Sequence, residues 1–411
     1  MMQKIRKFAV AVMAATLLAG AANAVELDLW HVFNLETDMI HAGIRDYQAA
    51  NPDVVIETRV LPFSQLSSEF VKAIATGEVP DLVVIDNPVM AGFADQGALA
   101  QLDDLIAQSQ SLKPENFYPG PWSTVRWNGK TYGVPRDSNT LALYYNADLF
   151  RAKGLDPDAP PATWDELMLA AEKLTDPANN VFGFAFSAVQ SEEGTFQFLP
   201  WLQQNGADID SLDSPEAAEA LRFWTDIVSR GYASKDVVTM RQYEAANTYI
   251  AGNAAMVTSG PWEMPRIAAE AKFDYRVALM PAKDPSTRKA SALGGFNWSI
   301  PAGSDNREEA FKVIEYMTSP AVFSHAWESG RLPSRADVVT PDPQWPESFA
   351  IFSEQMKTAR ARGPHPKWYD ISRALQSAIQ EALTGAETPE AALKKASATV
   401  NRILDKTPLD K

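Results

Sequence analysis

Strand and helix patterns alternate regularly from position 25 to position 85, and this alternation constrains the fold more than any other feature of the chain. Residues 25–32 and 54–60 alternate apolar with polar side chains, as strands with one buried face do. Residues 40–47 and 66–74 place apolar side chains on one helical face. Residues 82–85 are continuously apolar, which suits a strand of a parallel sheet covered by helices on both faces. This β-α-β-α-β order predicts an α/β fold.

The loops that follow these strands hold the first candidates for a site, because open α/β sheets bind ligands beyond the carboxyl ends of their strands. His31, Asn34 and Glu36 follow the first predicted strand. Asn34 also suits a turn or a helix cap, whereas a histidine is unusual at a strand tip. Asp86 follows the third strand, where a carboxylate either accepts hydrogen bonds from a ligand or caps the next helix.

The segment 131–174 predicts a strand, a helix, a stiff loop and a second helix in succession. Asn146 follows a short apolar run and suits the cap of the first helix. Three prolines exclude a helix from residues 156–161. Thr163 and Glu166 have the spacing of a capping box, which predicts that the second helix starts there.

The first 24 residues have the parts of a cleaved export signal. Three basic residues lie within positions 4–7, an apolar stretch too short to span a bilayer covers 8–20, and residues 22–24 read A-x-A. An uncleaved anchor is the alternative. No Cys follows to carry a lipid, and no later segment is apolar enough for a membrane span. We therefore expect a soluble protein of the periplasm of a Gram-negative bacterium.

Composition narrows the class of partner. The net charge is −15, and it becomes about −18 without the export signal, which argues against nucleic acid or anionic lipid as a partner. It leaves an anionic small ligand open, because a local pocket can oppose the overall sign. The chain has no cysteine, so burial alone must stabilise it. Eleven tryptophans are many for 411 residues, and an indole face either packs in a core or binds a sugar ring.

No pattern of catalytic or metal-binding residues stands out. The four histidines are scattered, without the spacing of a metal site. The chain has no nucleophile elbow, no nucleotide-binding glycine loop and no cysteine nucleophile. A pair of glycosidase carboxylates cannot be recognised in one acidic sequence. We expect no catalytic residue, no metal and no cofactor.

Seven motifs resemble, in the same order, stretches of the family 1 extracellular solute-binding proteins, the sugar-binding subunits of bacterial ABC importers. They are YGVP, YYN, PPATWDEL, AGNAAMVTSGPW, LGGFNWSIPAGSDNREEAFKVIEYMTSP, SGRLPSR and HPKWYDISRALQSAIQEALTGAETPEAAL. The resemblance implies a two-lobed periplasmic-binding-protein fold, with a central sheet flanked by helices in each lobe and a ligand cleft between the lobes. It implies an N-terminal lobe of residues 25–137 and 292–338 and a C-terminal lobe of 138–291 and 339–411, after a signal of residues 1–24.

The resemblance also implies ligand contacts. Trp262 matches an aromatic platform under a sugar ring, with a packed tryptophan as the alternative. Asp86 matches a contact to sugar hydroxyls, and Asp137 and Asn139 match a polar contact where the chain first crosses between lobes. Gly295 and Trp298 lie at a second crossing. Aromatic residues 296 and 298 alternate around Asn297, so Trp298 either enters the cleft or packs in the core.

Further candidates come from the last motif and from arginines. His365 and Trp368 match a segment that lines the cleft in relatives, and Arg362 lies near an arginine used by members that bind anionic ligands. Arg136 and Arg331 are further options. We include His31 as well, because of its position after the first strand.

The sequence thus predicts a protein that captures a carbohydrate by hinge closure and delivers it to the permease subunits of an ABC importer, as a monomer. One alternative is a binder of glycerol-3-phosphate or another anionic sugar or polyol. A second is a secreted polysaccharide-active enzyme, and a third is a binding module that serves a chemoreceptor. The identity of the ligand stays open.

Overall fold

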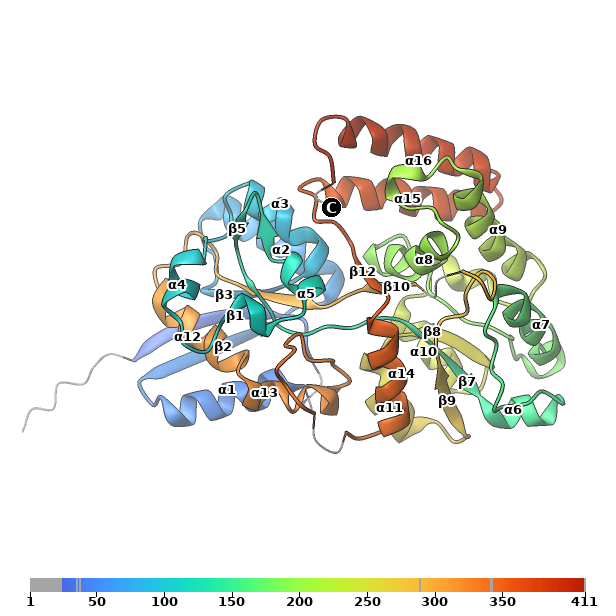
Figure 1. The fold of residues 1–411 in the computed structure, drawn as a ribbon, viewed down its shortest axis with the longest axis horizontal. Coiled ribbons are helices and arrows are strands. Elements are labelled where there is room, and N and C mark those ends of the chain that lie inside the picture. The colour runs from blue at the N-terminus through green and yellow to red at the C-terminus, as the bar shows by residue number, and fades with distance from the viewer. Residues whose placement is uncertain (1–23, 35, 37, 288–289, 341–342, 410–411) are drawn as a thin grey trace, which may run out of the picture.

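Two lobes lie side by side in the structure, a computed structural model that describes residues 24–34, 36, 38–287, 290–340 and 343–409 (Figure 1). The predicted export signal falls outside these residues except for Ala24. Each lobe has its own sheet and its own buried apolar cluster, as predicted for a two-lobed α/β fold. No helix within the described ranges is both long and apolar enough to cross a membrane.

The sheet of the first lobe has five strands in the order β2-β1-β3-β11-β6. β1 (Val25–His31) pairs in parallel with both β2 (Val54–Val60) and β3 (Leu82–Asp86), as the alternating pattern predicts. β11 (Phe296–Ser299) comes from much later in the chain and pairs antiparallel with β3 and with β6 (Val134–Pro135). A distant segment therefore completes the sheet in which the chain begins.

Helices cover both faces of this sheet, which explains why β3 is continuously apolar. α1 (Met39–Ala50) and α12 (Arg307–Met317) pack on one face, and α2 (Phe63–Thr76) and α3 (Met90–Asp95) on the other (Figure 1). The side chain of Asp38 caps α1 by accepting a hydrogen bond from the Ile40 amide at 3.0 Å. The cap places this carboxylate just beyond the carboxyl end of β1.

The second lobe contains a three-stranded antiparallel sheet. β7 (Ala142–Asn146) lies between β8 (Met256–Ser259) and β9 (Tyr275–Ala278). β10 (Ser291–Leu293) and β12 (Ala359–Ala361) form a separate parallel pair. The chain passes from the first sheet to the second between β6 and β7, and it returns between β10 and β11.

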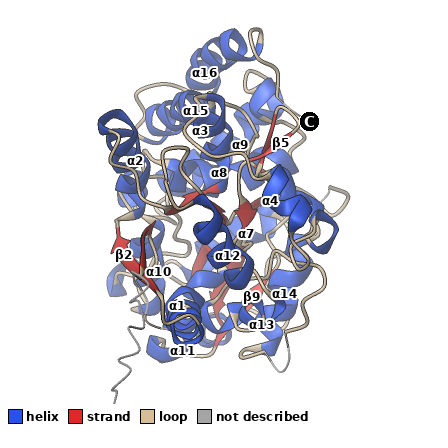
Figure 2. Ribbon diagram, turned by 90° about the vertical axis from the view of Figure 1, so that its left-hand side faces the viewer, coloured by secondary structure: helices blue, strands red, loops and turns tan. Residues whose placement is uncertain are grey.

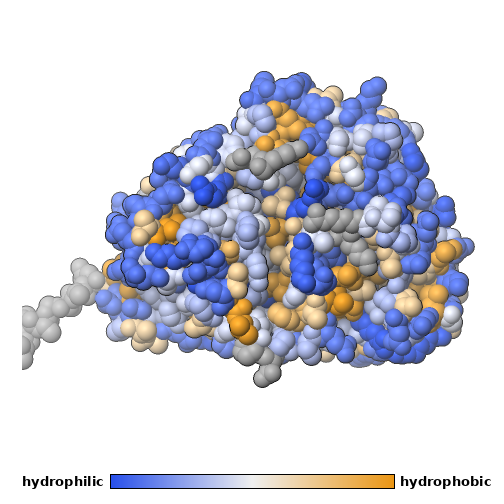
Figure 3. Space-filling model, in the orientation of Figure 1, coloured by the Kyte–Doolittle hydropathy of each residue, from blue (hydrophilic) through white to orange (hydrophobic). Residues whose placement is uncertain are grey.

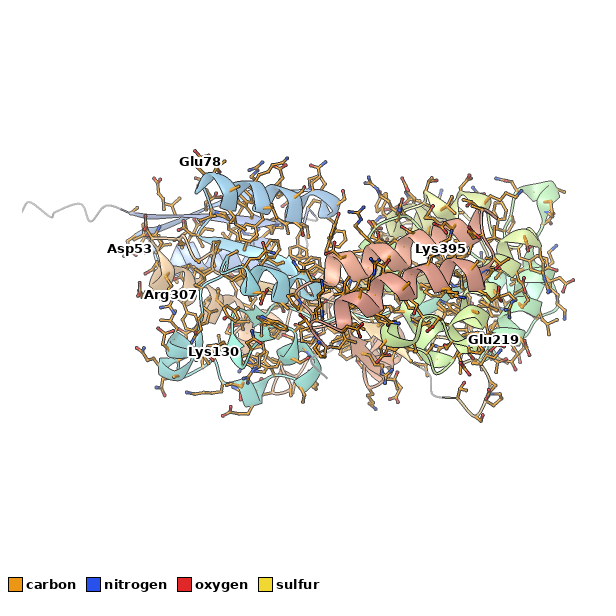
Figure 4. All side chains as sticks on the ribbon, turned by 90° about the horizontal axis from the view of Figure 1, so that it is seen from above. Asp53, Glu78, Lys130, Glu219, Arg307 and Lys395 are labelled. Atoms are coloured by element: carbon orange, nitrogen blue, oxygen red, sulfur yellow. The ribbon has the colours of Figure 1, made fainter. Side chains whose placement is uncertain are left out.

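Tryptophans fill the core of the second lobe. Trp164, Trp201 and Trp224 are buried there, with the Trp164 and Trp201 ring centroids 5.6 Å apart. α15 (Trp368–Leu383) and α16 (Pro389–Leu404) pack against each other and cover this core (Figures 2 and 4). Most tryptophans of the chain therefore have a packing role.

The helix caps predicted in the segment 131–174 are confirmed. Asn146 caps α6 (Ala147–Ala152) by accepting from the Leu149 amide at 3.0 Å. Thr163 and Glu166 form the predicted capping box at the start of α7 (Trp164–Leu174). These caps define the N-termini of α6 and α7 in the second lobe.

The face of the molecule drawn in Figure 3 is largely hydrophilic. The remaining elements complete the two lobes, and one of them, α8 (Glu192–Gln204), is mostly buried. The helices are α4 (Asp103–Gln108), α5 (Pro119–Ser123), α6 (Ala147–Ala152), α7 (Trp164–Leu174), α8 (Glu192–Gln204), α9 (Pro215–Ser229), α10 (Gln242–Ile250), α11 (Met264–Glu270), α13 (Pro320–Phe323) and α14 (Pro346–Met356). The strands are β4 (Arg126–Trp127) and β5 (Lys130–Thr131).

Three short segments cross between the lobes and contact one another. Asn139, between β6 and β7, forms an antiparallel bridge with Gly294, between β10 and β11. Ser138 forms a second bridge with Leu332, which lies on the third segment. The crossings thus form one small hydrogen-bonded unit. The lobe bounds derived from the sequence stay a prediction.

Candidate functional site

A cleft of about 620 Å³ lies between the lobes, beside the crossing segments. Its first-lobe wall consists of the loop after β1, the start of α2 and the ends of β3 and β11. Its second-lobe wall consists of the first turn of α8, the start of α10 and residues 262–270. Hollows of about 690 and 640 Å³ lie between α15 and α16 and beside β9, away from the crossings. Of these three hollows among the described residues, the central cleft is the one lined by both lobes, which makes it the candidate site.

Trp262 presents an aromatic ring to the cleft from the second lobe. It lies in a short 3-10 turn directly after β8, with its ring centroid 6.3 Å from that of Phe196 on α8. A Cβ at Gly260 would lie 1.9 Å from the Trp262 ring, so the ring folds back over a position that only glycine leaves free. The sequence motif therefore sets the orientation of the ring as well as its place.

Three phenylalanines face the cleft from the first lobe. Phe33 and Phe63 each meet Phe296 edge-on, with centroids 5.0 and 6.0 Å apart. Phe33 follows β1, Phe63 begins α2 and Phe296 begins β11. Aromatic surfaces on both walls suit a ligand whose ring carries C–H groups on its faces.

Arg362 connects the two lobes. Its guanidinium donates to the Asp86 carboxylate at 3.0 Å in the first lobe and to Glu192 at 2.7 Å in the second. It also donates to the Asn87 side chain at 3.1 Å and lies 4.6 Å from the Phe196 ring centroid. Burial outweighs the arginine and raises the pKa of Asp86 to about 6. Asp86 and Arg362, both predicted ligand contacts, line the cleft but bind each other.

A second ion cluster lies beneath the crossings. Arg136 is fully buried and bonds to both Asp38 and Asp137, with its guanidinium 3.6 Å from the Phe33 ring centroid. Asp137 also accepts from the Phe296 amide at 3.2 Å. Asp137 therefore joins the first two crossings and is absent from the lining of the cleft, in contrast to its predicted ligand contact.

Asn139 and Gly295, the other candidates at the crossings, do line the cleft. The Asn139 main chain exchanges two hydrogen bonds with Gly294, at 2.9 and 3.1 Å. Gly295 has φ of 137°, and a Cβ there would lie 2.3 Å from the Asp137 carbonyl oxygen. Glycine is required at this position because two crossing segments approach each other closely.

Comparison with known proteins identifies the family. Residues 35–322 match the family of bacterial extracellular solute-binding proteins. The chain belongs to this family. An ABC transporter solute-binding protein from Thermotoga lettingae, bound with α-D-tagatose, is 30% identical, with a TM-score of 0.84 over 92% of this chain and 100% of that one.

Other relatives of this solute-binding protein are similar over most of their length. Maltose-bound MalE3 of T. maritima is 27% identical, with a TM-score of 0.84 over 93% of this chain and 100% of that one. The maltotriose-binding protein of Pyrococcus abyssi is 27% identical over 384 residues, which cover 89% of this chain and 80% of that protein. These relatives are solute-binding proteins and not enzymes.

Besides Asp137, four predicted site residues of this solute-binding protein lie outside the lining of the cleft. Trp298 is fully buried in the core of the first lobe, because β11 is an inner strand of the sheet. Trp368 packs in the core of the second lobe and donates to Glu192 at 3.1 Å. His31 accepts from the Phe33 amide at 3.1 Å, and His365 lies 2.7 Å from the Thr407 carbonyl oxygen.

The two histidines are poor candidates for charged ligand contacts. Burial, with the charges of Arg136 and His41, lowers the pKa of His31 to about 4. Burial also lowers the pKa of His365. Both side chains are fully buried. His31 therefore supports the loop that carries Phe33, and His365 holds the C-terminal segment.

Charged residues at the second-lobe rim were not singled out by the sequence. Glu263 accepts from Arg266 at 2.7 Å, yet burial raises its pKa to about 7. The lining of the cleft also includes Arg331, from the third crossing, which the sequence did offer as a further option. Phe33, Phe63 and Phe196 were missed as well. A single phenylalanine has no sequence signature that separates a cleft wall from a core.

Proposed function

We propose that the chain is the periplasmic solute-binding subunit of an ABC importer and that its cleft captures a neutral carbohydrate. The observation that carries the proposal is the presence of aromatic surfaces on both walls, with Trp262 and Phe196 on one side and Phe33 and Phe296 on the other. Rings bind the C–H faces of a sugar, and polar groups bind its hydroxyls. Tagatose, maltose and maltotriose, named for the relatives, belong to this class.

The charges at the cleft favour a neutral ligand over an anionic one. Six carboxylate residues line the cleft against three arginines. Arg362 and Arg266 already have two carboxylate partners each. A phosphate or carboxylate ligand would meet a surplus of negative charge, which disfavours its binding. The glycerol-3-phosphate type of ligand is therefore the second candidate.

Closure of the lobes is the proposed mechanism of capture. Ligand contacts to both walls stabilise the closed form, so binding shifts the population towards it. We propose that the lobes consist of residues 25–137 with 292–338 and of 138–291 with 339–411, so that the bend lies in the crossings. No bond of the ligand is made or broken, and the closed form delivers the sugar to the permease.

The rest of the proposal concerns location and assembly. We place the protein in the periplasm after cleavage of the first 24 residues, without a lipid anchor, and as a monomer whose lobes move freely. Service to a chemoreceptor would use the same cleft and ligand, and pull-down of the permease subunits separates the two roles.

A thermal-shift screen tests the proposal. The mature protein is refolded to remove carried-over ligand and mixed with D-tagatose, maltose, maltotriose, D-glucuronate or glycerol-3-phosphate. A ligand at a hundred times its Kd adds about 2.7 kcal/mol to the free energy of unfolding. We expect a shift with a neutral sugar, recovered unaltered. A shift with only the anions would overturn the neutral assignment, and conversion of the sugar would favour the enzyme alternative.

A further inference from the structure

One arginine at the cleft, Arg331, has no strong partner within the part of the chain that the structure describes. The other two arginines of the lining are held by carboxylates, Arg266 by Glu263 and Glu270 and Arg362 by Asp86 and Glu192. Arg136, at the crossings, is held by Asp38 and Asp137. Among the described residues, Arg331 forms a single ion pair, in which its Nε lies 3.8 Å from the Asp38 carboxylate. That distance is too long for a hydrogen bond, and the buried Nε has no partner among the described residues.

The position of Arg331 is fixed by its neighbours. A Cβ at Gly330, which has φ of 65°, would lie 2.0 Å from the Pro261 carbonyl oxygen and 3.0 Å from the Trp262 Cα. The third crossing therefore packs directly on the turn that carries the Trp262 ring. The Arg331 guanidinium lies 5.2 Å from the Phe33 ring centroid. Its side chain is only 13% exposed, at the wall of the cleft.

A guanidinium in this position needs acceptors. Its donors lie in a planar fork that fits two neighbouring oxygens, and a buried donor without a partner is costly. Adjacent hydroxyls on a sugar ring offer two such oxygens side by side. A sugar ring stacked on Trp262 would bring its hydroxyls towards Arg331, because both residues belong to the same packed unit.

We propose that Arg331 is a specificity-determining residue that donates to two adjacent hydroxyl oxygens of a neutral sugar ring lying on Trp262. The inference rests on the proposed function and adds the recognition of a vicinal diol. A carboxylate also offers two acceptors. The negative charges of Asp38 and Glu263, which already interact with Arg331, would repel a ligand carboxylate at this position.

The test compares two substitutions with a matched control. Arg331→Gln removes the charge, and Arg331→Lys keeps the charge but loses the fork. Arg360→Gln is the control, because Arg360 is half exposed, pairs with Asp208 and lies outside the lining of the cleft. Calorimetric titration uses the tightest binder among maltose, maltotriose and D-tagatose, together with its monodeoxy derivatives. Thermal melts without ligand check that each variant folds.

We expect both Arg331 variants to weaken binding of the parent sugar by roughly tenfold or more, whereas Arg360→Gln binds like the wild type. The wild type should discriminate against the derivatives that lack either of two adjacent hydroxyls, and Arg331→Gln should lose that discrimination. Equal binding of the parent sugar, or discrimination retained by the variant, overturns the contact. If the wild type binds D-glucuronate more tightly than the neutral sugars, the proposed recognition of two adjacent hydroxyls is wrong. If it binds no sugar at all, the proposed function itself is wrong.

Discussion

Replacement of Arg362 by glutamine should weaken sugar binding by removing a connection between the lobes. Arg362 is 5% exposed and hydrogen-bonds to Asp86 in one lobe and to Glu192 in the other. Glutamine keeps much of the side-chain volume and loses the charge. Both carboxylates then remain near each other without a cation between them, which favours separation of the lobes.

The magnitude follows from the bonds that cross between lobes. A hydrogen bond to a charged group contributes about 1.5–3 kcal/mol. The bonds to Asp86 and Asn87 cross and the bond to Glu192 does not. The charge-assisted bond to Asp86 sets the scale, so we assign about 2 kcal/mol to closure, or about a thirtyfold increase in Kd. The loss of the Glu192 bond instead lowers the Tm of the ligand-free protein, because it acts within one lobe.

Calorimetric titration of Arg362→Gln, Asp86→Asn and the double variant measures this coupling. We expect the double variant to bind better than the sum of the single losses predicts, by about 1 kcal/mol or more. Arg360→Gln, two residues earlier and exposed, serves as the control. Wild-type Kd in Arg362→Gln, or strict additivity in the double variant, would refute the reasoning.

Three further predictions concern other parts of the cleft. Trp262→Ala should weaken sugar binding by over tenfold, about 1.4 kcal/mol, and unchanged affinity in a folded variant would remove the ring from the site. Gly295→Ala should lower the Tm, because its Cβ would lie 2.3 Å from the Asp137 carbonyl oxygen, and a wild-type melt would contradict that crowding. Glu263, with its pKa raised to about 7, binds a proton more tightly in the folded state, so its contribution to stability is complete below about pH 4.5 and is lost as pH rises through 7. Glu263→Gln should therefore flatten the dependence of Tm on pH between 5 and 8, and an unchanged profile would exclude this carboxylate as its source.

Local structure was predictable where the signal is short in range. The capping residues Asn146, Thr163 and Glu166 act within four positions, and all three serve as the sequence predicts. Trp262 lines the cleft, and its contact with a ligand stays a prediction. The motif around it contains Gly260, without which the ring would not fit.

The charge network of the cleft was not predictable, because its members are far apart in the chain. Arg362 bonds to Glu192, 170 positions away, and to Asp86, 276 positions away. No spacing rule links such residues. Trp298 was ambiguous for a different reason, since an inner strand such as β11 is covered on both faces and its side-chain alternation does not separate cleft from core.

The place of β11 in the first sheet has a consequence for biogenesis. β11 lies between β3 and β6, so a nascent chain that ends before Phe296 leaves β6 without its neighbour. Contacts between such distant segments form slowly during folding. The lobe that is synthesised first is thus finished late, after nearly three quarters of the polypeptide exists. The export proposed above would benefit from this delay, because a chain that folds late can cross a membrane before it folds.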